Sequence, residues 1–201
     1  MKQKRFSLRT AAIILALFVL ISLIRLPVIF ADGYSPLALS GSGTVTDPYR
    51  ISNADELAYL ANTVNKDEGW SATNGKHYVL TANIDLNDVS QANWKSKAKE
   101  WVYGTADDIE QRSFKGFWNG NGFVIRGLYI KDSAKLYNGL FPGIMATAKV
   151  ENIGFEDCYI DASAIEGSKS GCIAGGQHIW PLEGELHIDT SYVSYALQKI
   201  F

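Results

Sequence analysis

Two short sequence elements recur at nearly constant spacing in the second half of the chain, and this repeat constrains the fold most. Gly171-Cys-Ile-Ala-Gly matches the element that begins Gly139-Leu-Phe, 32 residues earlier. Phe155-Glu-Asp-Cys-Tyr-Ile-Asp aligns with Ile188-Asp-Thr-Ser-Tyr-Val-Ser, 33 residues later. Elements that recur at nearly one period indicate an architecture in which each unit stacks on the next.

The composition of these units favours short strands over helices. Twelve glycines fall between residues 116 and 184, which suits frequent corners. The strongest turn signal is Asn119-Gly-Asn-Gly122, because Asn and Gly tolerate positive φ. The pattern therefore predicts an all-β solenoid whose coils place like side chains on like. The expected apolar ladders consist of Val124, Ile125, Leu128, Val150, Ile153, Phe155 and Ile160.

The first half of the chain, beyond its apolar N-terminus, contains one helical pattern. Between Ser52 and Asn65, apolar residues follow helical spacing behind two capping residues, with Asp55 and Glu56 in the first turn. The alternating segment 78–86 predicts a strand, and strands are also expected within 114–118 and 123–130. The polar segment 87–113 is interpreted as an excursion loop.

The N-terminus has the pattern of a secretory signal peptide. Basic residues precede an almost entirely apolar run over 11–24, and the small residue Ala31 follows. Arg25 and Pro27 would fall inside a membrane span, so a cleaved signal over 1–31 is favoured over an anchor. The expected location is secreted or at the cell surface, with membrane contact only through this segment.

The exported remainder is acidic, and this excludes some classes of partner. The chain has 19 basic and 21 acidic residues, and five of the basic residues but none of the acidic ones lie in 1–31, which leaves a net charge of −7. Nucleic acid is therefore not an expected partner, because its affinity for proteins comes mainly from Lys and Arg. Segment 32–50 is interpreted as a leader, followed by a module over 51–201.

Ordered sequence blocks in this module resemble bacterial secreted proteins that carry the GLUG motif. The blocks are Gly43-Thr-Val-Thr-Asp-Pro-Tyr-Arg-Ile-Ser, Tyr78-Val-Leu-Thr-Ala-Asn-Ile-Asp-Leu, Phe114-Lys-Gly-Phe-Trp-Asn-Gly-Asn-Gly, Gly139-Leu-Phe-Pro-Gly-Ile and Ala148-Lys-Val-Glu-Asn-Ile-Gly. The resemblance implies a right-handed parallel β-helix with a capping α-helix over 53–65. The signal-peptide helix expected from the N-terminal pattern precedes it. The resemblance also places GLUG-like repeats at about 114–195 and implies a module that is incomplete at its C-terminal end. Pro142 and Gly171-Cys-Ile depart from the motif.

No pattern for catalysis or cofactor binding is evident in the sequence. Asp107, Asp108 and Glu110 are interpreted as solvated acidic surface, because proximity in a polar loop does not set the separation that a glycosidase needs. His77, His178 and His187 lack ligand spacing and are interpreted as ordinary strand or surface histidines. No cofactor is expected. The weak metal candidates, for Ca²⁺, are Asp85, Asn87 and Asp88.

Tryptophans and cysteines leave two alternatives open. Trp70, Trp94, Trp101 and Trp118 lie in or beside polar loops, where exposed rings would grip sugars. Of these, Trp94, Trp101 and Trp118 are the candidate ligand-binding residues, and the favoured alternative is that the two loop tryptophans cover the side of the solenoid. Cys158 and Cys172 are expected to be buried thiols, or else a disulfide, which export permits.

The expected function is adhesion or recognition by a non-catalytic surface module, with a glycan or another cell-surface component as partner. A rigid stack would present loops such as 87–113 without reordering its scaffold. The alternatives are an accessory part of a larger surface enzyme, polysaccharide-active or metallopeptidase, and an inactive truncated product.

Overall fold

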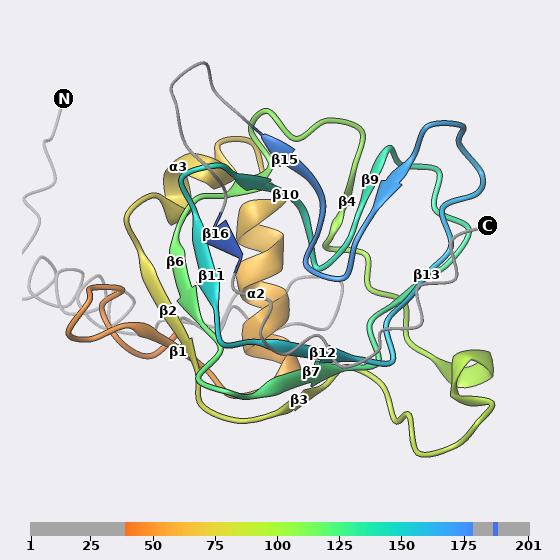
Figure 1. Ribbon diagram of the computed structural model, residues 1–201, viewed down its shortest axis with the longest axis horizontal. Helices are drawn as coiled ribbons and strands as arrows, with labels where there is room; N and C mark the ends of the chain where they lie inside the picture. The colour runs from red at the N-terminus through yellow and green to blue at the C-terminus, as the bar shows by residue number, and fades with distance from the viewer. Residues whose placement is uncertain (1–38, 179–186, 189–201) are drawn as a thin grey trace, which may run out of the picture. The chain divides into compact units, whose positions relative to one another are not determined.

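Short parallel strands dominate the computed structural model, which describes residues 39–178 and 187–188 (Figure 1). These residues belong to one unit, Leu37–Phe201. Helices are few within them: α2 (Ala54–Val64), α3 (Gly69–Thr73) and the 3-10 helix η1 (Trp94–Lys97). The prediction of an all-β fold with parallel strands is confirmed, while the signal-peptide prediction over 1–31 lies outside the described residues.

Sixteen short strands are assigned in the described part of the chain. In chain order they are β1 (Tyr49–Ile51), β2 (His77–Leu80), β3 (Ile84–Asp85), β4 (Thr105–Ala106), β5 (Ser113–Phe114), β6 (Phe117–Asn119), β7 (Val124–Arg126), β8 (Tyr129–Ile130), β9 (Tyr137–Asn138), β10 (Phe141–Met145), β11 (Lys149–Glu151), β12 (Gly154–Glu156), β13 (Tyr159–Ile160), β14 (Lys169–Ser170), β15 (Ala174–His178) and β16 (His187–Ile188).

The strands form five small sheets that the chain visits in the same order on successive turns. The largest sheet has the order β1-β2-β6-β11-β16, and the others are β15-β10-β5, β12-β7-β3, β13-β8 and β14-β9-β4. The run from β6 to β10 therefore visits every sheet once, and the run from β11 to β15 repeats it. All pairs between these strands are parallel except β4 with β9.

Aligned turns place apolar side chains in ladders, as the sequence predicts. Ile84 pairs with Ile125, which pairs with Phe155, and all three side chains are buried. Of the seven predicted ladder residues, five are buried, whereas Val124 and Ile160 are half-buried. Burying such side chains contributes about 1.5–3 kcal/mol each, so the ladders supply much of the stability of the stack.

The first predicted element does recur on adjacent turns, but its spacing is one residue longer than predicted, and the second element does not recur as predicted. Phe141 pairs with Ala174 and Gly143 with Gly176, so β10 and β15 are 33 residues apart and not 32. Ile188, however, pairs with Val150 and not with Phe155. The last turn is therefore longer than the period, and a similarity between short apolar-polar patterns did not reveal the difference.

Helix α2 forms where the sequence predicts it. The Asn53 side chain accepts a hydrogen bond from the N–H of Glu56 at 3.0 Å, and Glu56 accepts one from the N–H of Ser52 at 2.6 Å. This reciprocal arrangement satisfies backbone donors at the helix start. One face of α2 is buried and contacts α3 and β10. The buried residues are Leu57, Ala58, Leu60, Ala61 and Val64.

The turn predicted at 119–122 is a corner between two sheets. Asn121 and Gly122 have φ values of 53° and 80°, in the left-handed region that these residues tolerate. The strands on either side, β6 and β7, belong to different sheets and do not pair with each other. The turn therefore redirects the chain from one sheet to the next.

An aromatic cluster occupies the centre of the described core. Phe114 and Phe141 stack with ring centroids 5.2 Å apart, and Trp118 lies 5.6 Å from Phe141. All three side chains are buried. The indole N–H of Trp118 has no hydrogen-bond partner among the described residues, so ring packing must offset the cost of burying it.

Candidate functional site

The three tryptophans predicted as ligand-binding candidates are buried. Trp94, Trp101 and Trp118 are 8%, 6% and 1% exposed, respectively. Trp118 lies in β6 and its side chain packs in the core. None of the three offers an exposed ring face for a sugar, which argues against a platform made of their rings, although Trp118 borders the hollow described below.

The loop tryptophans instead hold segment 87–113 against the strands. Trp94 makes an edge contact with Tyr129, with ring centroids 5.9 Å apart. The indole N–H of Trp101 donates to the carbonyl of Leu140 at 3.1 Å, and Lys95 lies over the ring of Tyr159. The structure thus has the loop packed back onto the strand turns, which was the favoured alternative.

The weak metal candidates are committed to other contacts. Asp85 forms an ion pair with Arg126 at 3.5 Å. The side-chain amide of Asn87 donates to the carbonyls of Gly127 and Lys99, which fastens the start of the loop. Hydrogen bonds from Ser90 lower the pKa of Asp88 below its ordinary value. These three side chains do not converge on a cation, and no group of three or more His, Cys, Asp or Glu suited to a metal occurs in 39–178.

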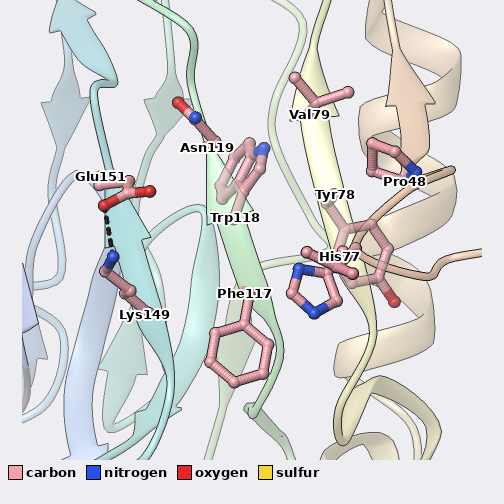
Figure 2. A pocket seen from close by; sticks show the side chains of 10 residues that line it. Pro48, His77, Tyr78, Val79, Phe117, Trp118, Asn119, Lys149 and Glu151 are labelled. Carbon is pink, nitrogen blue, oxygen red and sulfur yellow. Dashed lines mark ion pairs between the residues drawn. The ribbon is translucent and has the colours of Figure 1, made fainter.

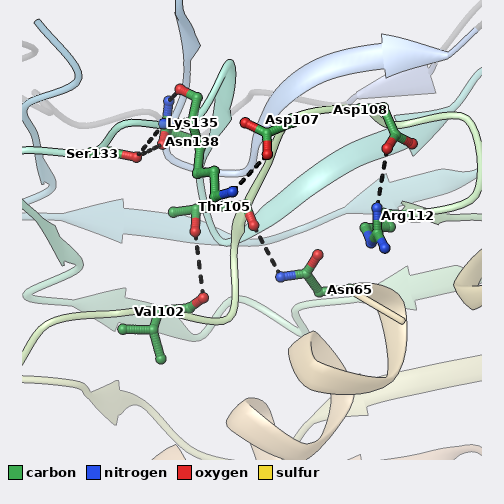
Figure 3. Close-up of polar contacts among 9 residues, drawn as sticks. All are labelled: Asn65, Val102, Thr105, Asp107, Asp108, Arg112, Ser133, Lys135 and Asn138. Carbon is green, nitrogen blue, oxygen red and sulfur yellow. Dashed lines mark hydrogen bonds and ion pairs between the residues drawn. The ribbon is translucent and has the colours of Figure 1, made fainter. Parts of the chain in front are cut away.

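The acidic residues of the loop lie on the surface, and two of them form ion pairs (Figure 3). Asp107 accepts from Lys135 at 2.6 Å, and Asp108 accepts from Arg112 at 3.1 Å. Glu110 is exposed. Figure 3 shows Asp107 and Asp108 directed toward different basic partners, so they do not form a pair that faces one bond.

Cys158 and Cys172 form a disulfide, with Cα atoms 6.1 Å apart. The sequence left buried thiols and a disulfide as alternatives, and the structure joins the two residues. The bond links Cys158, directly before β13, to Cys172 in the short segment between β14 and β15.

The outer face of the five-stranded sheet carries a hollow of about 310 Å³ (Figure 2). Strands β2, β6 and β11 provide most of its lining, and the turn before β1 provides the remainder. Its lining residues are Val45, Pro48, His77, Tyr78, Val79, Phe117, Trp118, Asn119, Lys149 and Glu151.

Strand register explains why particular residues face this hollow. Side chains alternate between the two faces of a strand, so Tyr78 and Trp118 point into the core while their neighbours point outward. One outward row, across β2, β6 and β11, begins with His77 and Phe117. These rings stack with centroids 4.7 Å apart, and Phe117 is 39% exposed.

The remaining outward positions carry an ion pair, an amide and one apolar side chain. Lys149 completes the first row, and the second row consists of Val79, Asn119 and Glu151. Lys149 and Glu151 form an ion pair at 2.7 Å (Figure 2). The carbonyl oxygen of the Asn119 side chain accepts from the N–H of Asn121 and from the Asn152 amide. The hollow therefore combines an aromatic pair with donors and acceptors.

A turn within the predicted leader contributes Val45 and Pro48 to the hollow. Three successive N–H groups, from Ser42 to Thr44, donate to the carbonyl of Asp47. Hydrogen bonding from Ser42 and the nearby Arg50 guanidinium hold the pKa of the Asp47 carboxyl below its usual value. The N–H of His77 donates to the carbonyl of Gly43, which joins this turn to β2.

Most residues of this site were not predicted from the sequence. His77 was interpreted as an ordinary strand histidine, and Phe117, Asn119, Lys149 and Glu151 were not singled out. The available signal was alternation beside Trp118: if the large buried ring points inward, then residues 117 and 119 point outward. Aligning 149–151 with 117–119 at the 32-residue spacing would have added the third strand. His178 lies in β15, and His187 lies in β16, where it is the register partner of Lys149.

The geometry of the hollow supports ligand binding more directly than it supports catalysis. An aromatic pair flanked by an amide and an ion pair provides apolar contact and polar anchors, the usual components of a small-molecule site. Burial, chiefly, raises the pKa of the Tyr78 phenol above its ordinary value near 10. Within the described ranges, no helix is both long and apolar enough to cross a membrane.

Comparisons with known proteins identify two distant relatives. The chain is 26% identical over 135 residues to a halomucin from Haloquadratum walsbyi, covering 67% of this chain and 1% of that protein. It is 29% identical over 143 residues to a protein named as a Gly-rich membrane protein from Evansella cellulosilytica, covering 68% of this chain and 14% of that protein. No family model matches the chain, and no solved structure matches it.

Proposed function

We propose that the protein is a non-catalytic module of the bacterial surface or secreted fraction that recognises glycans or other cell-surface components. In this proposal the N-terminal segment exports the chain. The observation that carries the proposal is the hollow on the outer sheet face, where the exposed ring of Phe117 lies beside polar side chains on a rigid scaffold.

We further propose that the turns form a right-handed parallel β-helix of the GLUG type, capped at its N-terminal end by α2. The parallel pairing of strands about one turn apart supports the β-helix, since adjacent turns stack in register. The buried face of α2 supports the cap, because such stacks need their terminal turns covered. The sequence blocks described above support the GLUG assignment.

The names of the matched proteins are consistent with a surface location. One is a halomucin and the other is named as a Gly-rich membrane protein. The chain spans only 1% and 14% of their lengths, so their names concern much larger proteins.

A glycan array probed with the purified full chain tests this function. We expect binding to at least one class of glycan, and no release of reducing ends from the bound sugar, because the module is proposed to be non-catalytic. If the chain binds none of the glycans and none of the bacterial or host cell surfaces tested, the proposed recognition function is contradicted. Release of reducing ends that disappears in an Asp107→Asn/Asp108→Asn variant would contradict the non-catalytic assignment.

A further inference from the structure

We propose that the hollow binds one unit of an uncharged sugar chain, which packs on the ring of Phe117 and hydrogen-bonds to Asn119 and Glu151. This inference rests on the proposed function and names its ligand class and contact residues. It assigns the site to the outer face of β2, β6 and β11, and not to the loop over 87–113.

The aromatic pair supplies the apolar part of the site. Phe117 is 39% exposed although it lies in the middle of a five-stranded sheet, with a neighbouring strand on each side. Its contact with His77, at 4.7 Å between centroids, fixes the ring on one side. A fixed aromatic surface loses little conformational entropy on binding, which favours contact with the C–H face of a sugar ring.

Polar groups beside the ring match sugar hydroxyls. The Asn119 carbonyl oxygen is occupied by Asn121 and Asn152, whereas its NH₂ group has no partner among the described residues. That NH₂ group is available as a donor. The carboxylate of Glu151 accepts hydrogen bonds, and its side chain is 31% exposed. A hydroxyl is both donor and acceptor, so adjacent hydroxyls can pair with both groups.

The charges at the hollow favour an uncharged ligand. Lys149 and Glu151 already neutralise each other at 2.7 Å. A sugar carboxylate would have to displace Glu151 from Lys149 and would then lie beside an unpaired carboxylate of the same sign. Such juxtaposition of like charges costs affinity, so the ion pair discriminates against acidic sugars. The lining contains no other Lys, Arg, Asp or Glu.

The direction of the rows indicates how a chain of sugars would lie. His77, Phe117 and Lys149 are register partners on three adjacent strands, and Val79, Asn119 and Glu151 form the parallel row. Both rows therefore run across the strands, and neighbouring positions in a row are about 4.8 Å apart. A sugar chain along these rows would keep its ring faces on the first row and its hydroxyls toward the second.

Calorimetry with the full chain tests the assignment, using cellohexaose, mannohexaose and hexagalacturonate as probes. We expect a neutral hexasaccharide to bind more tightly than hexagalacturonate. Phe117→Ser should weaken that binding by at least about tenfold. The matched control is Tyr59→Ser, because Tyr59 is also 39% exposed but lies on α2 and does not line the hollow.

Each outcome separates the inference from the function on which it rests. Neutral binding that Phe117→Ser removes and Tyr59→Ser retains supports both, provided that circular dichroism shows both variants folded. Glycan binding that survives a folded Phe117→Ser variant overturns the inference and leaves the proposed function intact. Tighter binding of hexagalacturonate overturns the assignment to uncharged sugars. If neither the array nor calorimetry detects glycan binding, the inference fails together with the glycan part of the function.

Discussion

At the scale of single residues, neighbours on one strand take opposite roles. Trp118 points into the core and contacts Phe114 and Phe141, while Phe117 points outward and keeps 39% of its surface exposed. Tyr78 occupies the inward position on the adjacent strand, in register with Trp118. The alternation places a buried phenol directly beneath the outer hollow, and its ionisation is coupled to folding.

Replacing Tyr78 with Phe should change stability mainly at alkaline pH. Burial raises the pKa of the folded-state phenol above its ordinary value near 10, so folding favours the neutral form. The stability that folding gains from keeping this phenol neutral is fully present below about pH 10. It is lost as the pH rises further, by up to about 1.4 kcal/mol per pH unit. Urea unfolding at pH 8, 10 and 11 should therefore show Tyr78→Phe gaining stability relative to the unmodified protein above pH 10. A constant difference in the free energy of unfolding between the two proteins across this range would contradict a raised pKa of Tyr78 in the folded state.

At the scale of elements, the outer face of the three-stranded sheet β12-β7-β3 carries a ladder of charges. Arg126 on β7 pairs with Glu156 on β12 and with Asp85 on β3, so one guanidinium links three turns of the chain. The hydrogen bond that Arg126 donates to the Glu156 carboxylate is the chief cause that raises the pKa of the guanidinium. The Arg126 side chain is 28% exposed, so solvent screens these pairs only in part.

Arg126→Gln should destabilise the protein by about 1 kcal/mol, because two carboxylates lose their shared partner. Lys131→Gln is the matched control. Its ion pair with Asp132 is exposed and joins adjacent residues of one turn, so its loss should destabilise the protein less than Arg126→Gln does. Urea unfolding at low ionic strength measures both changes in the free energy of unfolding, and the Arg126→Gln effect should shrink in 1 M NaCl. Equal effects of the two variants would show that the Arg126 ion pairs stabilise the protein no more than an exposed ion pair within one turn does.

Elements with local signals could be predicted from the sequence. The capping residue Asn53 and the apolar spacing gave helix α2, and Asn121 with Gly122 gave the corner. Both depend on residues within a few positions of each other. The ladders could also be predicted, because a repeat places similar residues on adjacent turns.

Features that depend on packing between distant segments could not be predicted in the same way. Trp94 and Trp101 lie in a polar segment, and only their contacts with Tyr129 and Leu140 show that they are buried. The outer hollow likewise requires strand register, since β2 and β6 are separated by the whole excursion loop. The disulfide depends on a Cα separation that sequence spacing does not supply.

At the scale of the whole molecule, each turn contacts mainly the turns next to it. Strand β10 pairs with β5 and β15, and β6 pairs with β2 and β11. In such a stack, stability is approximately a sum of terms for single turns and for their interfaces. Loss of one interaction should therefore loosen its own turn before it affects distant ones, and opening should be local instead of all-or-none.

The disulfide offers the sharpest test of this behaviour, because it lies within the turn β11–β15. Cys158 and Cys172 are 14 residues apart, and closing a loop of this length is worth about 3 kcal/mol by chain entropy. Hydrogen exchange should show faster exchange over residues 159–176 in a Cys158→Ala/Cys172→Ala variant, with β1–β3, which do not pair with this turn, keeping most of their protection. Reduction of the unmodified protein should give the same pattern, and reductant should not change the variant further. If each turn is stabilised mainly by its neighbours, the lost free energy stays in the turn that the bond closes and in the turns next to it. A uniform rise in exchange over all turns would therefore mean that the stack unfolds as one cooperative unit.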